Sequence, residues 1–86
     1  MPNVAEMLSK MKSNPGDIRF YDLCLVCDHY FGTARQKGSS HRIYKTPWHG
    51  DPRINVQNDK GKVKKYQVKQ VLRAIVLMEV YHGTEK

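Results

Sequence analysis

Residues 36–45 read Gln-Lys-Gly-Ser-Ser-His-Arg-Ile-Tyr-Lys and form the centre of the expected fold. The Gly-Ser pair is typical of a tight turn, and the residues on either side of it suit two short strands. We therefore expect a β-hairpin with strands over residues 33–37 and 40–46. The same stretch holds a histidine, His41, among basic residues, so it combines a turn, a proton-transfer group and positive charge.

Two helices are expected before the hairpin. Residues 3–11 have one apolar stripe at helical spacing, and Asn3 with Glu6 three residues later forms a capping-box pattern. Asp17 is a natural N-cap for the second helix, which should end at Gly32. The apolar faces consist of Val4, Met7, Leu8 and Met11 in the first helix and Phe20, Leu23, Cys24, Cys27, Tyr30 and Phe31 in the second.

A third strand and a last helix follow the hairpin. Residues 53–57 alternate between polar and apolar side chains, and a turn over residues 58–61 leads to a helix over about 64–80. The apolar stripe of that helix consists of Val68, Val71, Leu72, Ile75 and Met78. The order helix, helix, three strands, helix predicts an α+β fold of two layers, in which helices cover one face of a three-stranded antiparallel sheet.

The length of 86 residues corresponds to a single domain, residues 1–86, with residues 1–13 as an N-terminal helical extension of a main unit over residues 14–80. Neither a run of about 18 apolar residues nor an apolar signal core occurs, so no membrane association is expected. Cys24 and Cys27 share one expected helix, where a disulfide would be strained, and this favours a reducing, cytoplasmic setting.

Positive charge dominates the chain. The sequence has 15 Lys and Arg against 8 Asp and Glu, a formal net charge of +7, which favours an anionic partner such as nucleic acid. Residues 60–65 place lysines before and at a helix N-terminus, where cations are disfavoured unless an anion binds; the alternative is an ordinary solvated face. The residues expected to contact RNA are Arg35, Lys37, Ser39, Ser40, Arg42, Lys45, Lys60, Lys62, Lys64 and Lys65.

His41 is the candidate catalytic residue. Histidine is the side chain that titrates near neutral pH, and a base that removes the 2′-OH proton of RNA lets that oxygen attack the adjacent phosphate without a metal. Strand alternation puts His41 on the same side as Ile43, which is expected to face the core, so a structural histidine is the alternative. His49, beside Trp48 in the following loop, is either a second proton-transfer group or a solvated loop residue.

The pair Cys24 and Cys27, with His29 as a third ligand, could instead hold a metal. A structural zinc site usually has four ligands, often as two pairs, and the chain has no second cysteine pair. Both thiols fall on the apolar face of the expected helix, so we expect them to pack in the core. The sequence therefore predicts no metal site and no cofactor.

Four segments, taken in order, resemble the HicA-type toxins of bacterial toxin–antitoxin systems, which are ribonucleases acting on mRNA. They are residues 14–23, 35–44, 54–57 and 61–68, the last reading Gly-Lys-Val-Lys-Lys-Tyr-Gln-Val. The resemblance implies a double-stranded-RNA-binding-domain-like fold and a single catalytic histidine at the position of His41. It also implies an antitoxin partner, similar to HicB, that covers this site.

The chain departs from that family in two places. The join over residues 32–34 is shorter than usual, and residues 55–57, Asn-Val-Gln, lack the histidine that many relatives carry in their third strand. The sequence therefore leaves three candidate functions. The first is a metal-independent endoribonuclease acting on mRNA, the second a non-catalytic RNA-binding module of the same fold, and the third a domain whose basic face serves only an acidic protein partner.

Overall fold

The computed structural model describes residues 3–38, 40–46 and 53–84. Its elements, in chain order, are α1 (Val4–Ser13), β1 (Ile18–Arg19), α2 (Phe20–Phe31), β2 (Gln36–Lys37), β3 (His41–Lys45), β4 (Arg53–Gln57), β5 (Lys62–Val63) and α3 (Lys65–Thr84). The expected α+β class is confirmed. Within the described residues, none of the helices has the length and apolarity that a membrane span needs.

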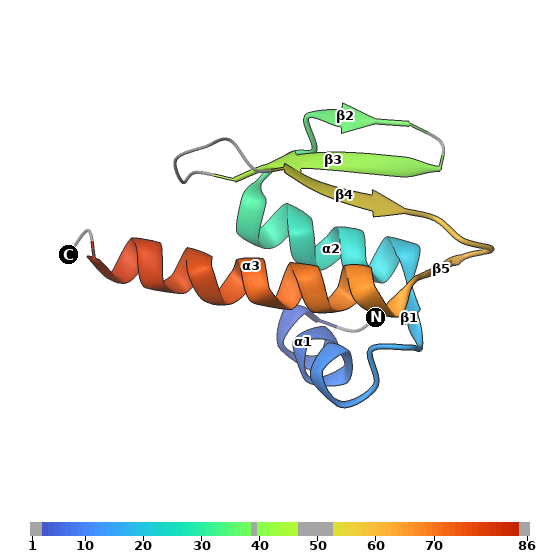
Figure 1. The fold of residues 1–86 in the computed structure, drawn as a ribbon, viewed down its shortest axis with the longest axis horizontal. Coiled ribbons are helices and arrows are strands. Elements are labelled where there is room, and N and C mark those ends of the chain that lie inside the picture. The colour runs from blue at the N-terminus through green and yellow to red at the C-terminus, as the bar shows by residue number, and fades with distance from the viewer. Residues whose placement is uncertain (1–2, 39, 47–52, 85–86) are drawn as a thin grey trace.

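The elements form three layers (Figure 1). Strands β2, β3 and β4 make an antiparallel sheet in that order, and α2 and α3 pack on one of its faces. Helix α1 packs on these two helices from the side away from the sheet, with Met7 and Met11 buried in the common core. The expected two layers are therefore extended by a third, because the apolar stripe of α1 covers the outer sides of α2 and α3.

The core-facing side of β3 is opposite to the expected one. In the register of β3 and β4, Tyr44 lies opposite Ile54 and Arg42 opposite Val56, and Tyr44 and Val56 are 0% exposed. Alternation then turns Ile43 toward the helix-free face of the sheet. The expectation that Ile43 faces the core is wrong, because the larger apolar ring of Tyr44 takes that place and finds a partner for its hydroxyl.

A polar contact ties this buried tyrosine to α2. The Tyr44 hydroxyl donates to Asp28 Oδ1 at 2.7 Å and lies 3.4 Å from the carbonyl oxygen of Cys24. Burial of the ring raises the pKa of the Tyr44 hydroxyl, which therefore stays protonated as a donor. The contact fixes the position of β3 on α2, since a buried hydroxyl is held where its partner lies.

A second, smaller sheet joins two turns that are far apart in the sequence. Ile18 of β1 pairs with Val63 of β5, and the N–H of Phe20 donates to the carbonyl of Gly61 at 3.0 Å. Neither strand was expected, because two residues are too few for a periodic signal. The expected N-cap role of Asp17 is wrong: Arg19 precedes α2 and no side chain caps this helix.

Asp17 instead links three parts of the chain by charge. Its Oδ1 accepts a hydrogen bond from Lys62 Nζ at 2.7 Å, and its Oδ2 lies 3.9 Å from Lys10 Nζ. The hydrogen bond from Lys62, followed by the charges of Lys62 and Lys10, lowers the pKa of Asp17 below its usual value of 3.8. The ionised carboxylate therefore favours the folded chain.

We expect Asp17→Asn to remove a pH-dependent part of the stability. A carboxylate whose pKa is lower in the folded state stabilises the fold fully above its unfolded pKa, and this contribution is lost as the pH falls through the folded pKa. The unfolding free energy of the wild type should thus exceed that of the variant at neutral pH. The difference should shrink below about pH 4, the ordinary range of an aspartate.

Urea denaturation at a series of pH values measures this difference. Glu79→Gln is the matched control, since it removes one carboxylate from an exposed position of α3. A wild-type advantage over Asp17→Asn that stays constant down to pH 2 would contradict the assignment.

Candidate nucleic-acid interface

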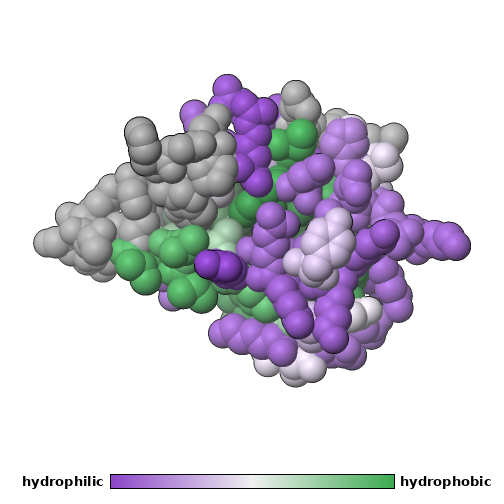
Figure 2. Space-filling view, in the orientation of Figure 1, coloured by the Kyte–Doolittle hydropathy of each residue, from purple (hydrophilic) through white to green (hydrophobic). Residues whose placement is uncertain are grey.

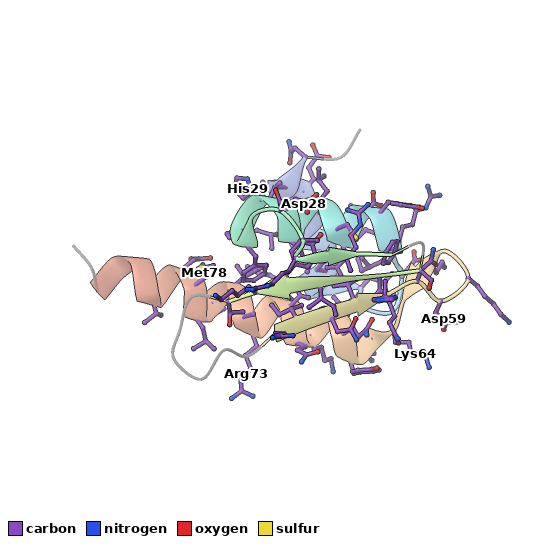
Figure 3. The ribbon with its side chains drawn as sticks, turned by 90° about the horizontal axis from the view of Figure 1, so that it is seen from above. Asp28, His29, Asp59, Lys64, Arg73 and Met78 are labelled. Atoms are coloured by element: carbon purple, nitrogen blue, oxygen red, sulfur yellow. The ribbon has the colours of Figure 1, made fainter. Side chains whose placement is uncertain are left out.

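One face of the three-stranded sheet carries no helix. Figure 3 looks onto this face from above, with α2 and α3 behind the sheet. The paired register places polar and basic side chains together on it. Its residues are His41, Ile43 and Lys45 on β3 and, directly opposite each of them, Gln57, Asn55 and Arg53 on β4.

His41 begins β3 and is partly exposed on this open face. The N–H of Gly38 donates to the carbonyl of His41 at 2.9 Å, which closes the hairpin. A Cβ atom at Gly38 would lie 3.2 Å from His41 Cε1 and 3.4 Å from Nδ1. The glycine thus leaves room for the imidazole, which a side chain at this position would crowd.

The outer edge of β4 is closed by a side chain of α3. Gln67 Nε2 donates to the carbonyl of Asn55 at 3.1 Å, and Gln67 Oε1 accepts from the N–H of Gln57 at 3.2 Å. The amide takes the place of a neighbouring strand's peptide group, and Gln67 is only 5% exposed. This role of Gln67 was not expected from the sequence, although a glutamine one position before the apolar Val68 on a buried helix face was a usable signal.

A pocket of about 240 Å³ opens where the sheet meets the start of α3. His41 is not one of its lining residues, but the preceding residue Ser40 and the cross-strand partner of His41, Gln57, both line it. The carbonyl of Ser40 accepts from the N–H of Asn58 at 2.8 Å, so two walls of the pocket are joined. The full lining consists of Ser40, Gln57, Asn58, Asp59, Lys64 and Gln67.

A tight turn between β4 and β5 shapes this end of the molecule. The backbone N–H groups of Asp59 and Lys62 each donate to the carbonyl oxygen of the other residue. Between them, Lys60 and Gly61 have φ values of 54° and 89°. Asn58 Oδ1 accepts from the N–H of Gly61 at 2.6 Å. The turn expected over residues 58–61 is confirmed. A lysine in a left-handed position is unusual, because such a turn favours asparagine or glycine there.

The structure brings some of the expected RNA contacts together. Lys64 lines the pocket with Ser40, and Lys45 lies on the open face. Lys60 is exposed in the turn before β5, and Lys65 is exposed at the start of α3. Figure 2 shows the part of the surface over β5 and the start of α3 as mainly hydrophilic.

Other expected contacts lie elsewhere. Arg42 points to the helix side, where its guanidinium lies 3.8 Å from Asp28 and 5.9 Å from the centre of the Phe20 ring. Lys62 is held by Asp17. Each of these two cations therefore has an aspartate of the fold as its partner, which leaves it less available to a phosphate.

The remaining residues expected at the interface are Arg35, Lys37 and Ser39. Arg35 is exposed, and its N–H donates to the carbonyl of Ile43 at 2.6 Å. Ser39 and the side chain of Lys37 lie outside the described part of the chain. The alternative candidates in the loop, His49 and Trp48, lie outside it as well.

The two cysteines belong to the core, as expected. Cys24 and Cys27 are both buried, and burial raises the pKa of the Cys27 thiol. His29 is exposed on α2 and packs edge-on against Tyr30. In the described ranges, no group of three His, Cys, Asp or Glu side chains is arranged to hold a metal ion.

In comparisons with known proteins, no family model, no curated protein and no solved structure matches this chain.

Proposed function

We propose that this chain is a metal-independent endoribonuclease that acts on mRNA with His41 as its general base, in the manner of the HicA-type toxins it resembles. One observation carries the proposal: His41 lies partly exposed on the helix-free face, and its chain neighbour Ser40 and its cross-strand partner Gln57 line a polar pocket. This placement removes the objection that His41 shares its side of the strand with a core residue. An open sheet face with basic residues at its end suits an extended polymer.

The chemistry needs only a positioned base and nearby positive charge. An imidazole nitrogen of His41 accepts the proton of the ribose 2′-OH, and the O2′–P bond forms as the P–O5′ bond breaks. The departing 5′ oxygen takes a proton from water, which leaves a 2′,3′-cyclic phosphate and a 5′-OH end. Such a base contributes about 10²–10⁴-fold to the rate, and a cation near the phosphate stabilises the charge that develops on it.

The arrangement of the elements supports a double-stranded-RNA-binding-domain-like fold. Elements α2, β2, β3, β4 and α3 follow one another in the expected order, and both helices lie on the same side of the sheet. Helix α1 and the β1–β5 pair are additions to that unit. Under this proposal the protein acts in the cytoplasm, where mRNA is found, and an antitoxin similar to HicB covers the open face.

The products of the reaction test the proposed function. We expect the purified protein to cleave single-stranded RNA in the presence of EDTA and to leave 2′,3′-cyclic phosphate and 5′-OH ends, which mass spectrometry identifies. RNA with a 2′-deoxy nucleotide at the cleaved position should resist, because it lacks the nucleophile. Fragments with 3′-OH ends would contradict the mechanism, and salt-dependent binding without cleavage would favour the non-catalytic RNA-binding module.

A further inference from the structure

The pocket beside His41 contains two opposite charges that do not neutralise each other. Asp59 lies in the turn after β4, and Lys64 is the residue directly before α3. Figure 3 shows both at the same end of the sheet. Among the described residues neither one forms an ion pair, whereas Lys62 and Arg42 each lie against an aspartate. The carboxylate and the ammonium group are therefore available to a ligand.

The lining of the pocket is better suited to a nucleobase than to a phosphate group. The Asp59 carboxylate would repel a phosphate, while a neutral base offers both donors and acceptors along one edge. Guanine has two adjacent donors, N1–H and the N2 amino group, which a carboxylate can accept together. The neighbouring O6 is an acceptor for an ammonium group. Adenine and uracil lack this donor–donor–acceptor sequence.

We propose that this pocket binds a guanine base of single-stranded RNA, with Asp59 accepting from N1–H and N2–H and Lys64 donating to O6. The proposal rests on the proposed function and adds a base preference to it. Asn58 uses its Oδ1 for the N–H of Gly61, so its amino group remains as a further donor. Ser40 and Gln57 line the pocket and are the chain neighbour and the cross-strand partner of His41, so under this proposal the bound guanine belongs to a nucleotide near the cleaved bond.

Binding of three RNAs that differ in one base tests the pocket without relying on cleavage. Each is a short single strand whose central nucleotide is guanosine, inosine or adenosine, with a 2′-O-methyl group there to block the reaction. Fluorescence anisotropy at fixed salt gives the Kd for each. We expect wild type to bind the guanosine strand about tenfold more tightly than the other two, since inosine lacks the N2 amino group and adenosine lacks both donors.

The variant Asp59→Asn should lose this preference, because its amide offers one acceptor oxygen where the carboxylate offers two. Glu79→Gln, which removes the same charge from an exposed position late in α3, is the control and should keep the preference. Equal Kd values for all three strands in wild type, or an unchanged preference in Asp59→Asn, would overturn the guanine pocket and leave the role of His41 intact. Failure of wild type to bind any of the strands would overturn the proposed function and the pocket together.

Discussion

Replacing His41 with alanine should lower the rate of RNA cleavage by about 10²–10⁴-fold, the range that a general base contributes. In the proposed function the imidazole of His41 accepts the 2′-OH proton, so the variant lacks the base. His41 is partly exposed at the start of β3, so its removal should leave the fold intact. Single-turnover cleavage of a labelled RNA gives the rate, and anisotropy gives the affinity.

The affinity of the His41→Ala variant for RNA should stay close to that of wild type, because the basic residues around the pocket remain. The matched control is His29→Ala, since His29 is exposed on α2 and lies away from the open face. Equal cleavage by wild type and His41→Ala would exclude the catalytic role. A parallel loss of cleavage and affinity would instead make His41 a binding residue.

Replacing Tyr44 with alanine should lower the free energy of unfolding by about 3–5 kcal/mol, the usual cost of removing a buried aromatic ring. Tyr44 is the largest fully buried side chain of the described core, and it joins the sheet to α2 through Asp28. A domain of this size is stable by roughly 4–13 kcal/mol, so the substitution removes a large part of the total. Urea denaturation of both proteins measures the difference.

Two further variants separate the ring of Tyr44 from its hydroxyl. Tyr44→Phe keeps the ring and loses the hydrogen bond to Asp28, which should cost about 0.5–1.5 kcal/mol. Tyr66→Ala removes a tyrosine that is 61% exposed on α3, and it should change the stability by less than about 0.5 kcal/mol. A loss in Tyr44→Ala no larger than that in Tyr66→Ala would show that the ring does not hold the sheet on the helices.

Periodicity and turn chemistry predicted most of the elements. The apolar stripes over residues 3–11 and 64–80 correspond to α1 and α3, and the alternating run over residues 53–57 has the bounds of β4. These signals are local, so they can be read from the sequence without knowledge of the packing. The short strands β1 and β5 were missed, because their pairing depends on contacts between distant parts of the chain.

The candidate site was predicted only in part, and for a related reason. His41, Ser40 and Lys64 were expected from their residue types, and the structure brings them to one end of the sheet. The contribution of Gln67 was not expected, because its partners are backbone groups of β4. That Asp59 forms no ion pair with another described residue could not be read from the sequence either, since it depends on which cations lie near it in space.

The sequence alone determines which residues alternate along β3. It also determines the basic character of the chain and the presence of Gly38 in the turn before His41. Which side of β3 faces the helices is a property of the packed structure. Ile43 and Tyr44 are both apolar enough for the core. Tyr44 is the one that packs against the helices, because Asp28 of α2 accepts a hydrogen bond from its hydroxyl. That contact, made across the layers, is what turns His41 toward the open face of the sheet.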